Sequence, residues 1–143
     1  MSKKLPKIIS FASAVDADHS APDSSRLIAG RPVFTTRNYF VDAKQQFYSG
    51  IWSSTEGRWR VSYTEHEFCS LLEGRVRLVS DDGSASDFGM GDSFVIPAGF
   101  NGTWETVTAC RKLYVIYIPE PLRTTRRRAI GVKKKKVRRP RRK

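Results

Sequence analysis

The chain has 143 residues, 39% of them hydrophobic, which suits one domain with one modest core. No apolar run approaches the roughly eighteen residues that span a bilayer, and no apolar segment of signal-peptide length follows the basic start. The two cysteines, Cys69 and Cys110, are too few for a disulfide framework and form no C-x-x-C pair. These features argue against a membrane or secreted protein. They predict a cytoplasmic protein whose cysteines are reduced core residues.

The net charge of +12 is concentrated at one end of the sequence. Residues 123–143 contain thirteen Lys or Arg and no acidic residue, which leaves thirteen basic and fourteen acidic residues in 1–122. Like charges and scarce apolar surface predict a disordered basic tail over residues 121–143. Such a tail either has no function or attaches to a polyanion without reading its sequence. Any attraction to nucleic acid is therefore assigned to the tail and not to the rest of the chain.

The segments before the tail are typical of short strands. Residues 1–25 are rich in Ser, Ala and Asp, and they predict a flexible N-terminal arm, with one added edge strand around 7–11 as an option. Strand-like segments then follow, in chain order: edge strands within 31–48, then 46–52, 58–63, 68–80, 94–96, 102–107 and 112–118. The sequence Asp81-Asp82-Gly83-Ser84 has the chemistry of a hairpin turn. Turn residues at regular spacing and no helical period predict an all-β sandwich or barrel over residues 26–120.

Two segments about twenty residues apart share a glycine signature. Six residues separate Glu67 from Gly74, and Gly91 is followed after five residues by Pro97 and after one more by Gly99. Gly74 and Gly91 are placed where a tight turn requires positive φ, and Pro97 closes a strand that does not use its N–H.

This spacing resembles the two motifs of cupin barrels. The residues around it, from 49 to 117, are similar to the ureidoglycine-aminohydrolase-like branch of cupins, which includes the ethanolamine-utilisation cupins. The resemblance implies a double-stranded β-helix, the cupin jelly-roll barrel, with a ligand site built from both motifs. It carries no information about which ligand that site takes.

The resemblance also implies where a metal would bind, and the residues at those positions are not the expected histidine ligands. Metal-binding cupins have an H-x-H pair before the glutamate, which falls here at Val61 and Tyr63, or at Arg60 and Ser62 with the other spacing. The histidine of the second motif falls at Gly102. We therefore expect no metal cofactor. The alternative is a divalent transition metal held by four side chains. These are Tyr63, Glu65, Glu67 and a rotated His66.

Glu67 is the main candidate for chemistry. Side chains alternate along a strand, so if Glu67 faces the interior, Cys69 and Leu71 do too, while Phe68 and Leu72 face outward. A carboxylate inside a small barrel needs a partner or a ligand, and the alternative is an exposed Glu67. The expected neighbours are three ligand-binding side chains, with Glu65 as a further candidate. They are Tyr63, Trp104 at the barrel mouth, and Lys112, which either faces inward beside Glu67 or outward to solvent.

Three functions compete on this evidence. The first is a small cupin that binds a small polar metabolite in its barrel. The second is an enzyme, a lyase, isomerase or amidohydrolase acting on a nitrogenous metabolite, with Glu67 as general base. The third is a nucleic-acid-associated protein that acts through its basic tail. The outward apolar positions Phe68 and Leu72 also predict a homodimer.

Overall fold

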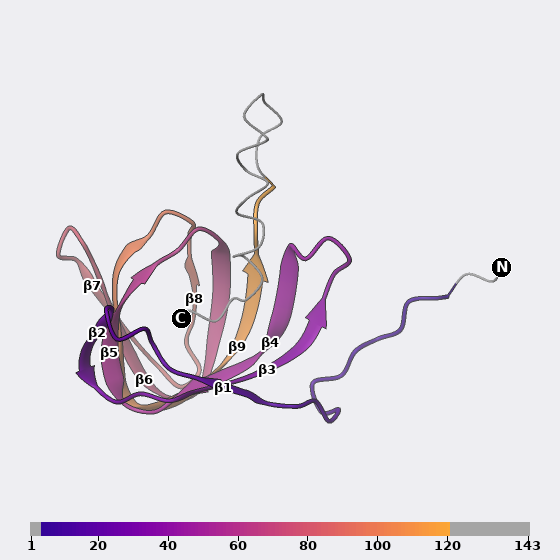
Figure 1. The fold of residues 1–143 in the computed structure, drawn as a ribbon, viewed down its shortest axis with the longest axis horizontal. Coiled ribbons are helices and arrows are strands. Elements are labelled where there is room, and N and C mark those ends of the chain that lie inside the picture. The colour runs from indigo at the N-terminus through magenta and orange to yellow at the C-terminus, as the bar shows by residue number, and fades with distance from the viewer. Residues whose placement is uncertain (1–3, 121–143) are drawn as a thin grey trace.

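The computed structural model describes residues 4–120, and these residues form strands and turns without a helix. The strands are β1 (Asp18–Ser20), β2 (Leu27–Gly30), β3 (Phe34–Val41), β4 (Phe47–Ser54), β5 (Gly57–Ser62), β6 (His66–Ser80), β7 (Ala85–Gly89), β8 (Ser93–Ile96) and β9 (Asn101–Tyr117). All pairings are antiparallel, and the sheet curls into a barrel-like shell (Figure 1). The expected all-β, double-stranded β-helix is confirmed. Within the described range no helix could cross a membrane.

The longest strand, β9, connects the two halves of the sheet. Its first half pairs with β5 and its second half pairs with β4, while β6 runs along its other edge. The resulting order is β1-β3-β4-β9-β5-β2, and β6 also pairs with β7 and β8. The sequence predicted β9 as two strands, 102–107 and 112–118, but the backbone continues through residues 108–111. Because one strand contributes to both halves, residues far apart along β9 can face the same interior.

Gly74 lies inside β6 and not at a turn between two strands as the motif spacing suggested. Its φ is +87°, and the pairing register of β6 with β9 shifts on both sides of it. A Cβ at this position would collide with the carbonyl oxygen of Ala109, so only glycine fits without a backbone shift. Gly91, with φ +93°, does lie in a turn, between β7 and β8. The expected positive φ is present at both glycines.

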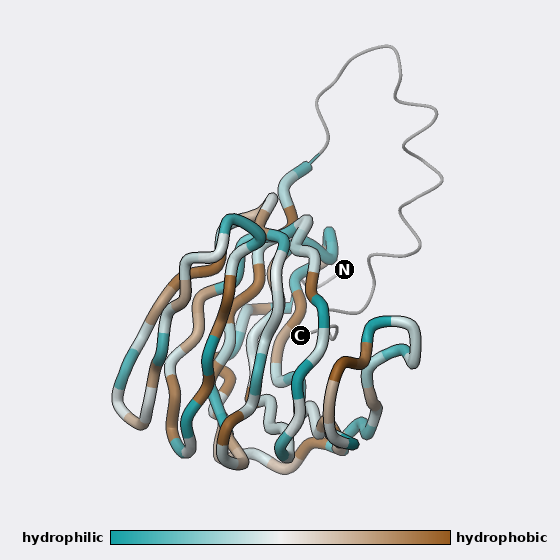
Figure 2. The backbone as a smooth tube through the Cα atoms, turned by 90° about the vertical axis from the view of Figure 1, so that its left-hand side faces the viewer, coloured by the Kyte–Doolittle hydropathy of each residue, from teal (hydrophilic) through white to brown (hydrophobic). Residues whose placement is uncertain are grey.

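Inward and outward side chains alternate without interruption from residue 59 to residue 71. Every second residue there is buried: Trp59, Val61, Tyr63, Glu65, Glu67, Cys69 and Leu71. Figure 2 shows the same mixing of hydrophilic and hydrophobic residues along single strands. The alternation continues through residues 63–65, which connect β5 to β6. Three polar residues of the first motif therefore face the core, namely Tyr63, Glu65 and Glu67. Large aromatic side chains fill the rest of it, above all Phe34, Trp52, Trp59 and Trp104.

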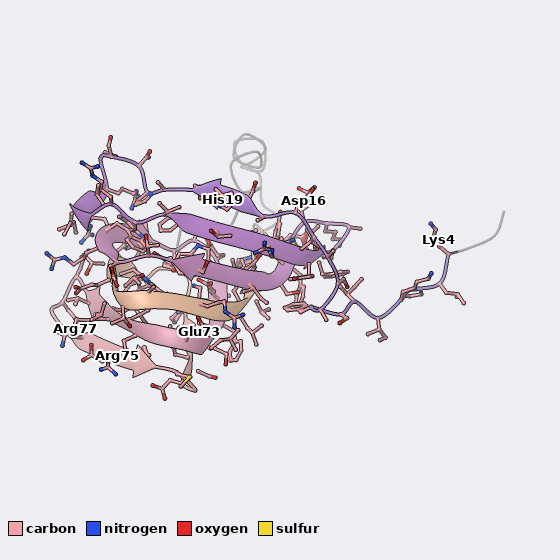
Figure 3. All side chains as sticks on the ribbon, turned by 90° about the horizontal axis from the view of Figure 1, so that it is seen from below. Lys4, Asp16, His19, Glu73, Arg75 and Arg77 are labelled. Atoms are coloured by element: carbon pink, nitrogen blue, oxygen red, sulfur yellow. The ribbon has the colours of Figure 1, made fainter. Side chains whose placement is uncertain are left out.

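The N-terminal segment leaves the barrel. The strand in this segment is β1, which pairs with β3 through residues 18–20. The optional edge strand expected at residues 7–11 is not formed. Phe11 stacks on Tyr39 with ring centroids 4.5 Å apart, and the chain before it extends away from the sheet (Figure 1). Lys4, labelled in Figure 3, lies well beyond the barrel. The predicted basic tail over 121–143 falls outside the described residues.

Candidate functional site

A buried ion pair lies in the barrel interior. The Lys112 Nζ donates to Glu67 Oε2 at 2.9 Å, and the two side chains are 0% and 1% exposed. The same ammonium lies 3.5 Å from Cys69 Sγ. Two charges removed from water cost several kcal/mol each unless they neutralise one another, so this pair has to remain together while the barrel is closed.

Strand register explains how Lys112 reaches Glu67. Lys112 on β9 lies opposite Leu71 on β6, and Glu67 is four residues further along β6 on the same face. The four-carbon stem of Lys112 and the side chain of Glu67 reach toward one another along this face, and the ammonium also contacts Cys69, which lies between Leu71 and Glu67 on it. The sequence left the orientation of Lys112 open, and the structure places it inward.

Two indole rings flank the ammonium. Its nitrogen is 4.5 Å from the ring centroid of Trp52 and 4.4 Å from that of Trp104. The two rings meet nearly at right angles, with centroids 5.5 Å apart. Trp52 lies opposite Lys112 on β4, whereas Trp104 comes from the first half of β9. A desolvated cation against a tryptophan face gains about 2 kcal/mol, so the rings offset part of the cost of burying Lys112.

The surroundings of Lys112 keep it protonated. Burial alone would lower the pKa of Lys112, but the electrostatic effects of Cys69 and Glu67 outweigh it and raise the pKa above its ordinary value. Lys112 is therefore a stable cation in the folded protein and not a neutral amine poised to act as a nucleophile.

Two buried donors remain beside this pair. The indole N–H groups of Trp52 and Trp59 have no hydrogen-bond partner among residues 4–120, although both residues are only 1% exposed. By contrast, the indole N–H of Trp104 donates to Thr106 Oγ1 at 3.0 Å. Buried donors are almost always satisfied in proteins, so the two indoles mark positions that an acceptor atom from water or a ligand could fill.

The structure brings together three of the five predicted site residues. Glu67, Lys112 and Trp104 are in contact through the ammonium. Tyr63 and Glu65 are buried on the same inward face. The Tyr63 ring packs edge-on against Phe100, and Glu65 Oε1 accepts hydrogen bonds from the backbone and hydroxyl of Thr64, both at 3.1 Å.

The predicted position of Trp104 at the barrel mouth is wrong. The side chain is fully buried between Trp52, Trp59 and Phe94. The prediction placed Trp104 by its distance from the second motif, but the side chain faces inward and packs in the aromatic core. Trp104 is therefore part of the wall around the cation.

The residues do not fit a transition-metal site. Val61 and Tyr63 face inward at the positions of the H-x-H pair, and neither is a histidine. At Gly102 a Cβ would collide with the carbonyl oxygen of Val79, so no side chain fits there without a backbone shift. His66 lies on the outer face and accepts a hydrogen bond from the Ala98 N–H at 3.0 Å. Among residues 4–120, no three His, Cys, Asp or Glu side chains converge as a metal requires.

Two residues of the site were missing from the predicted set. Trp52 was not among the predicted ligand-binding residues, and Cys69 was predicted to be a reduced core residue. The relevant signal is cross-strand pairing, because Trp52 lies opposite Lys112 and Cys69 lies between Leu71 and Glu67. That signal becomes readable only once the register of β4, β6 and β9 is known.

Comparisons with known proteins agree on the fold. The sequence model of the EutQ-like cupin domain matches residues 41–114. No curated protein matches the chain. The EutQ protein of Clostridium difficile is 20% identical, with 71% of this chain and 75% of that chain covered and a TM-score of 0.55. The cupin domain of Schizosaccharomyces pombe Cnp3 is 13% identical, with 68% and 71% covered and a TM-score of 0.54. At these identities the two structures show a shared fold alone.

A third similar structure is more closely related in sequence. It is a DUF861-family protein of unknown function from Pseudomonas syringae pv. tomato, which is 28% identical with a TM-score of 0.67. The alignment covers 76% of this chain but only 46% of that one. The chain therefore spans less than half the length of this relative.

Proposed function

Because this chain belongs to the family of EutQ-like cupins, we propose that its barrel binds a small polar metabolite at the Lys112–Glu67 pair. The buried pair is the observation that carries the proposal. A ligand that separates the pair must give each member a new partner, since either charge alone in the interior is costly. It must therefore present an anionic group to Lys112 and a hydrogen-bond donor to Glu67. The unsatisfied indole donors of Trp52 and Trp59 favour further acceptor atoms on the same molecule.

The other predicted residues take supporting roles in this proposal. Trp104 covers an apolar or planar face of the ligand, next to the ammonium. Tyr63 and Glu65 lie on the same inward face as Glu67, where a hydroxyl and a carboxylate extend the polar surface. In the enzyme alternative, Glu67 would remove a proton from the substrate. Because Glu67 accepts the Lys112 hydrogen bond, that step would first require the pair to open, so binding takes precedence over catalysis.

The test is a thermal-shift screen followed by calorimetry. The probes are small molecules with both a carboxylate and a donor, such as glycine, β-alanine and N-carbamoylglycine, each beside its carboxylate-only counterpart, acetate or propionate. The bifunctional probes should raise the Tm of the wild type. Glu67→Gln, which keeps shape and removes charge, should weaken binding of the best probe about tenfold or more. Equal affinity of wild type and Glu67→Gln would remove Glu67 from the site.

A second candidate function belongs to the tail. Residues 123–143 hold half of the 26 Lys and Arg residues of the chain and none of its 14 acidic residues. We propose attachment to a polyanion such as RNA through this segment. Binding of the full chain to a single-stranded RNA of arbitrary sequence should weaken steeply with salt. A chain ending at residue 122 should lose the binding and keep its Tm. Affinity that survives the truncation would place the surface on the barrel.

Cytoplasmic location and a homodimer complete the proposal. Cys69 and Cys110 are not joined by a disulfide, as expected in a reducing compartment. Exposed apolar side chains on the outer face of the sheet, including Phe68 and Val95, support a partner subunit. The proposed domain organisation keeps an arm over 1–25, the barrel over 26–120 and the basic tail over 121–143, with β1 as the part of the arm that joins the sheet.

A further inference from the structure

We infer that the Lys112 ammonium is the permanent cation of this barrel, held in a site that selects an alkylammonium ion. The inference goes beyond metabolite binding, because it concerns the cation that the chain itself supplies. It holds whether or not a metabolite enters the barrel.

The first support is the disagreement between this barrel and the metal-binding pattern. Of the metal-ligand positions in the cupin pattern, the glutamate position is the one that keeps the expected residue in this chain, Glu67. Its ion-pair partner is Lys112 Nζ at 2.9 Å. The positions of the other ligands carry Val61, Tyr63 and a glycine that tolerates no side chain. The carboxylate is thus neutralised by a tethered organic cation instead of by an ion taken from solution.

The second support is the chemistry around the ammonium. A divalent transition metal requires several N, O or S donors directed at one point. Here the nitrogen meets one carboxylate oxygen and one thiol, and the remaining sides face the rings of Trp52 and Trp104 at 4.5 and 4.4 Å. Aromatic faces attract a diffuse organic cation but give no lone pair to a metal. The site therefore prefers an ammonium to a metal, and a charged group to a neutral one of equal size.

Chemical rescue tests this selectivity. Lys112→Ala removes the atoms of an n-propylammonium ion and leaves Glu67 in a wall lined by Trp52 and Trp104. Added n-propylammonium should raise the Tm of Lys112→Ala with the logarithmic concentration dependence of binding at one site, by about 3–4 °C at about five times its Kd. Propan-1-ol, which has nearly the same shape without the charge, should raise it far less.

Two control variants separate the site from a general effect of amines. Lys112→Met fills the volume and should gain nothing from n-propylammonium. Lys112→Ala combined with Glu67→Gln should lose most of the rescue, because the carboxylate is gone. Equal gains from the amine and the alcohol, or equal gains in Lys112→Ala and Lys112→Met, would overturn the inference. So would a Lys112→Ala chain that stays unfolded at every amine concentration.

A measurement on the wild type does not depend on a variant that folds. In a protein labelled with 15N and 13C, one lysine should show a slowly exchanging NH3+ signal, with its ε-CH2 protons shifted upfield by the two indole rings. Lys112→Met should lack that signal. Added Zn2+, which is diamagnetic, should leave it in place. Loss of the signal on adding one equivalent of Zn2+ would show that a metal displaces the ammonium, contrary to the inference.

Discussion

The free-energy cost of burying the Lys112–Glu67 pair comes from removing both charges from water. Opening a buried pair by removing one partner costs about 3–5 kcal/mol, because an uncompensated charge stays inside. Exchanging both partners for apolar side chains of similar volume is often neutral or stabilising. The pair is therefore better explained by a requirement for charge in the barrel than by stability.

A double-mutant cycle measures this directly. Glu67→Leu and Lys112→Met should each lower the free energy of unfolding by about 3–5 kcal/mol, and the double variant should recover most of that loss. Urea denaturation of the four proteins gives the numbers. Additive losses in the double variant would show that the two charges are not coupled, in conflict with the 2.9 Å contact.

The pair also predicts a pH dependence. The folded pKa of Lys112 lies above its ordinary value of 10.5, so the stability that Lys112 contributes is complete below about pH 10.5. It is lost as the pH rises through the raised folded pKa. The part of the unfolding free-energy difference between the wild type and the double variant that comes from Lys112 should thus stay constant from pH 7 to pH 8 and change only above pH 10.5. Burial raises the pKa of the Cys110 thiol and Lys112 lowers it, so removing Lys112 raises the pKa of Cys110 further, and the thiol adds its own pH dependence near and above its ordinary value of 9.0. A difference that changes between pH 7 and pH 8, below the titration of the thiols, would contradict the assignment.

Single residues also show what the sequence could predict of the site. The motif spacing favoured an inward Glu67 over the exposed alternative, and the side chain is buried. Lys112 could not be oriented, because a lysine in a strand is compatible with either face until its partner on the neighbouring strand is known. Trp104 was misplaced because its burial depends on packing against Trp52 and Trp59 on other strands, which the local sequence does not show.

At the scale of strands, the bend in β6 depends on one glycine. Gly74 combines a positive φ with a backbone contact that leaves no room for a Cβ, whereas Gly83, with φ +94°, has open space around it. Gly74→Ala should therefore cost more than Gly83→Ala, which carries only the conformational penalty of about 1–2 kcal/mol. We expect a further loss of about 1–3 kcal/mol at Gly74, because the added Cβ would overpack the contact with Ala109. Thermal unfolding of both variants gives the comparison, and equal losses would mean that the bend tolerates a side chain.

Strand existence was easier to predict than strand extent. The alternation of residues 58–63 and the run from 68 to 80 predicted β5 and most of β6 from local sequence. The halves of β9 were separated because residues 108–111 have no pattern of their own, yet pairing with β6 and β4 keeps them extended. The exposed β1 was missed for a related reason: it is held by backbone pairing with β3, and no apolar pattern marks it.

For the molecule as a whole, the two ends of the outer sheet face differ in character. At the end near β7, exposed ion pairs join Arg77 to Asp87 at 2.9 Å and Arg111 to Glu73 at 3.2 Å. Figure 3 shows Glu73, Arg75 and Arg77 along this side of the barrel. Such pairs add about 0–1 kcal/mol each and keep the surface solvated. That end is therefore an unsuitable surface for association.

The other end of the face is apolar. Phe68 is 41% exposed and lies between Val95 on β8 and Val115 on β9, and Tyr117 lies opposite Phe47 on β4. Val95 is 59% exposed. These pairings join the residues into one patch across four strands. The N-terminal arm adds exposed apolar residues away from the barrel, among them Ile8 at 95% exposure.

This patch predicts a homodimer formed through the outer face. Light scattering of the purified protein should give about twice the monomer mass of 16.2 kDa at micromolar concentration. Phe68→Glu should shift the mass toward one chain, because a charge would be buried in the interface. Met90→Glu is the matched control, since Met90 is 73% exposed in the turn between β7 and β8, outside the patch, and should leave the mass unchanged. Both variants should keep the wild-type circular dichroism spectrum, because neither side chain belongs to the core. A monomer mass for the wild type, or dissociation by Met90→Glu as readily as by Phe68→Glu, would refute this interface.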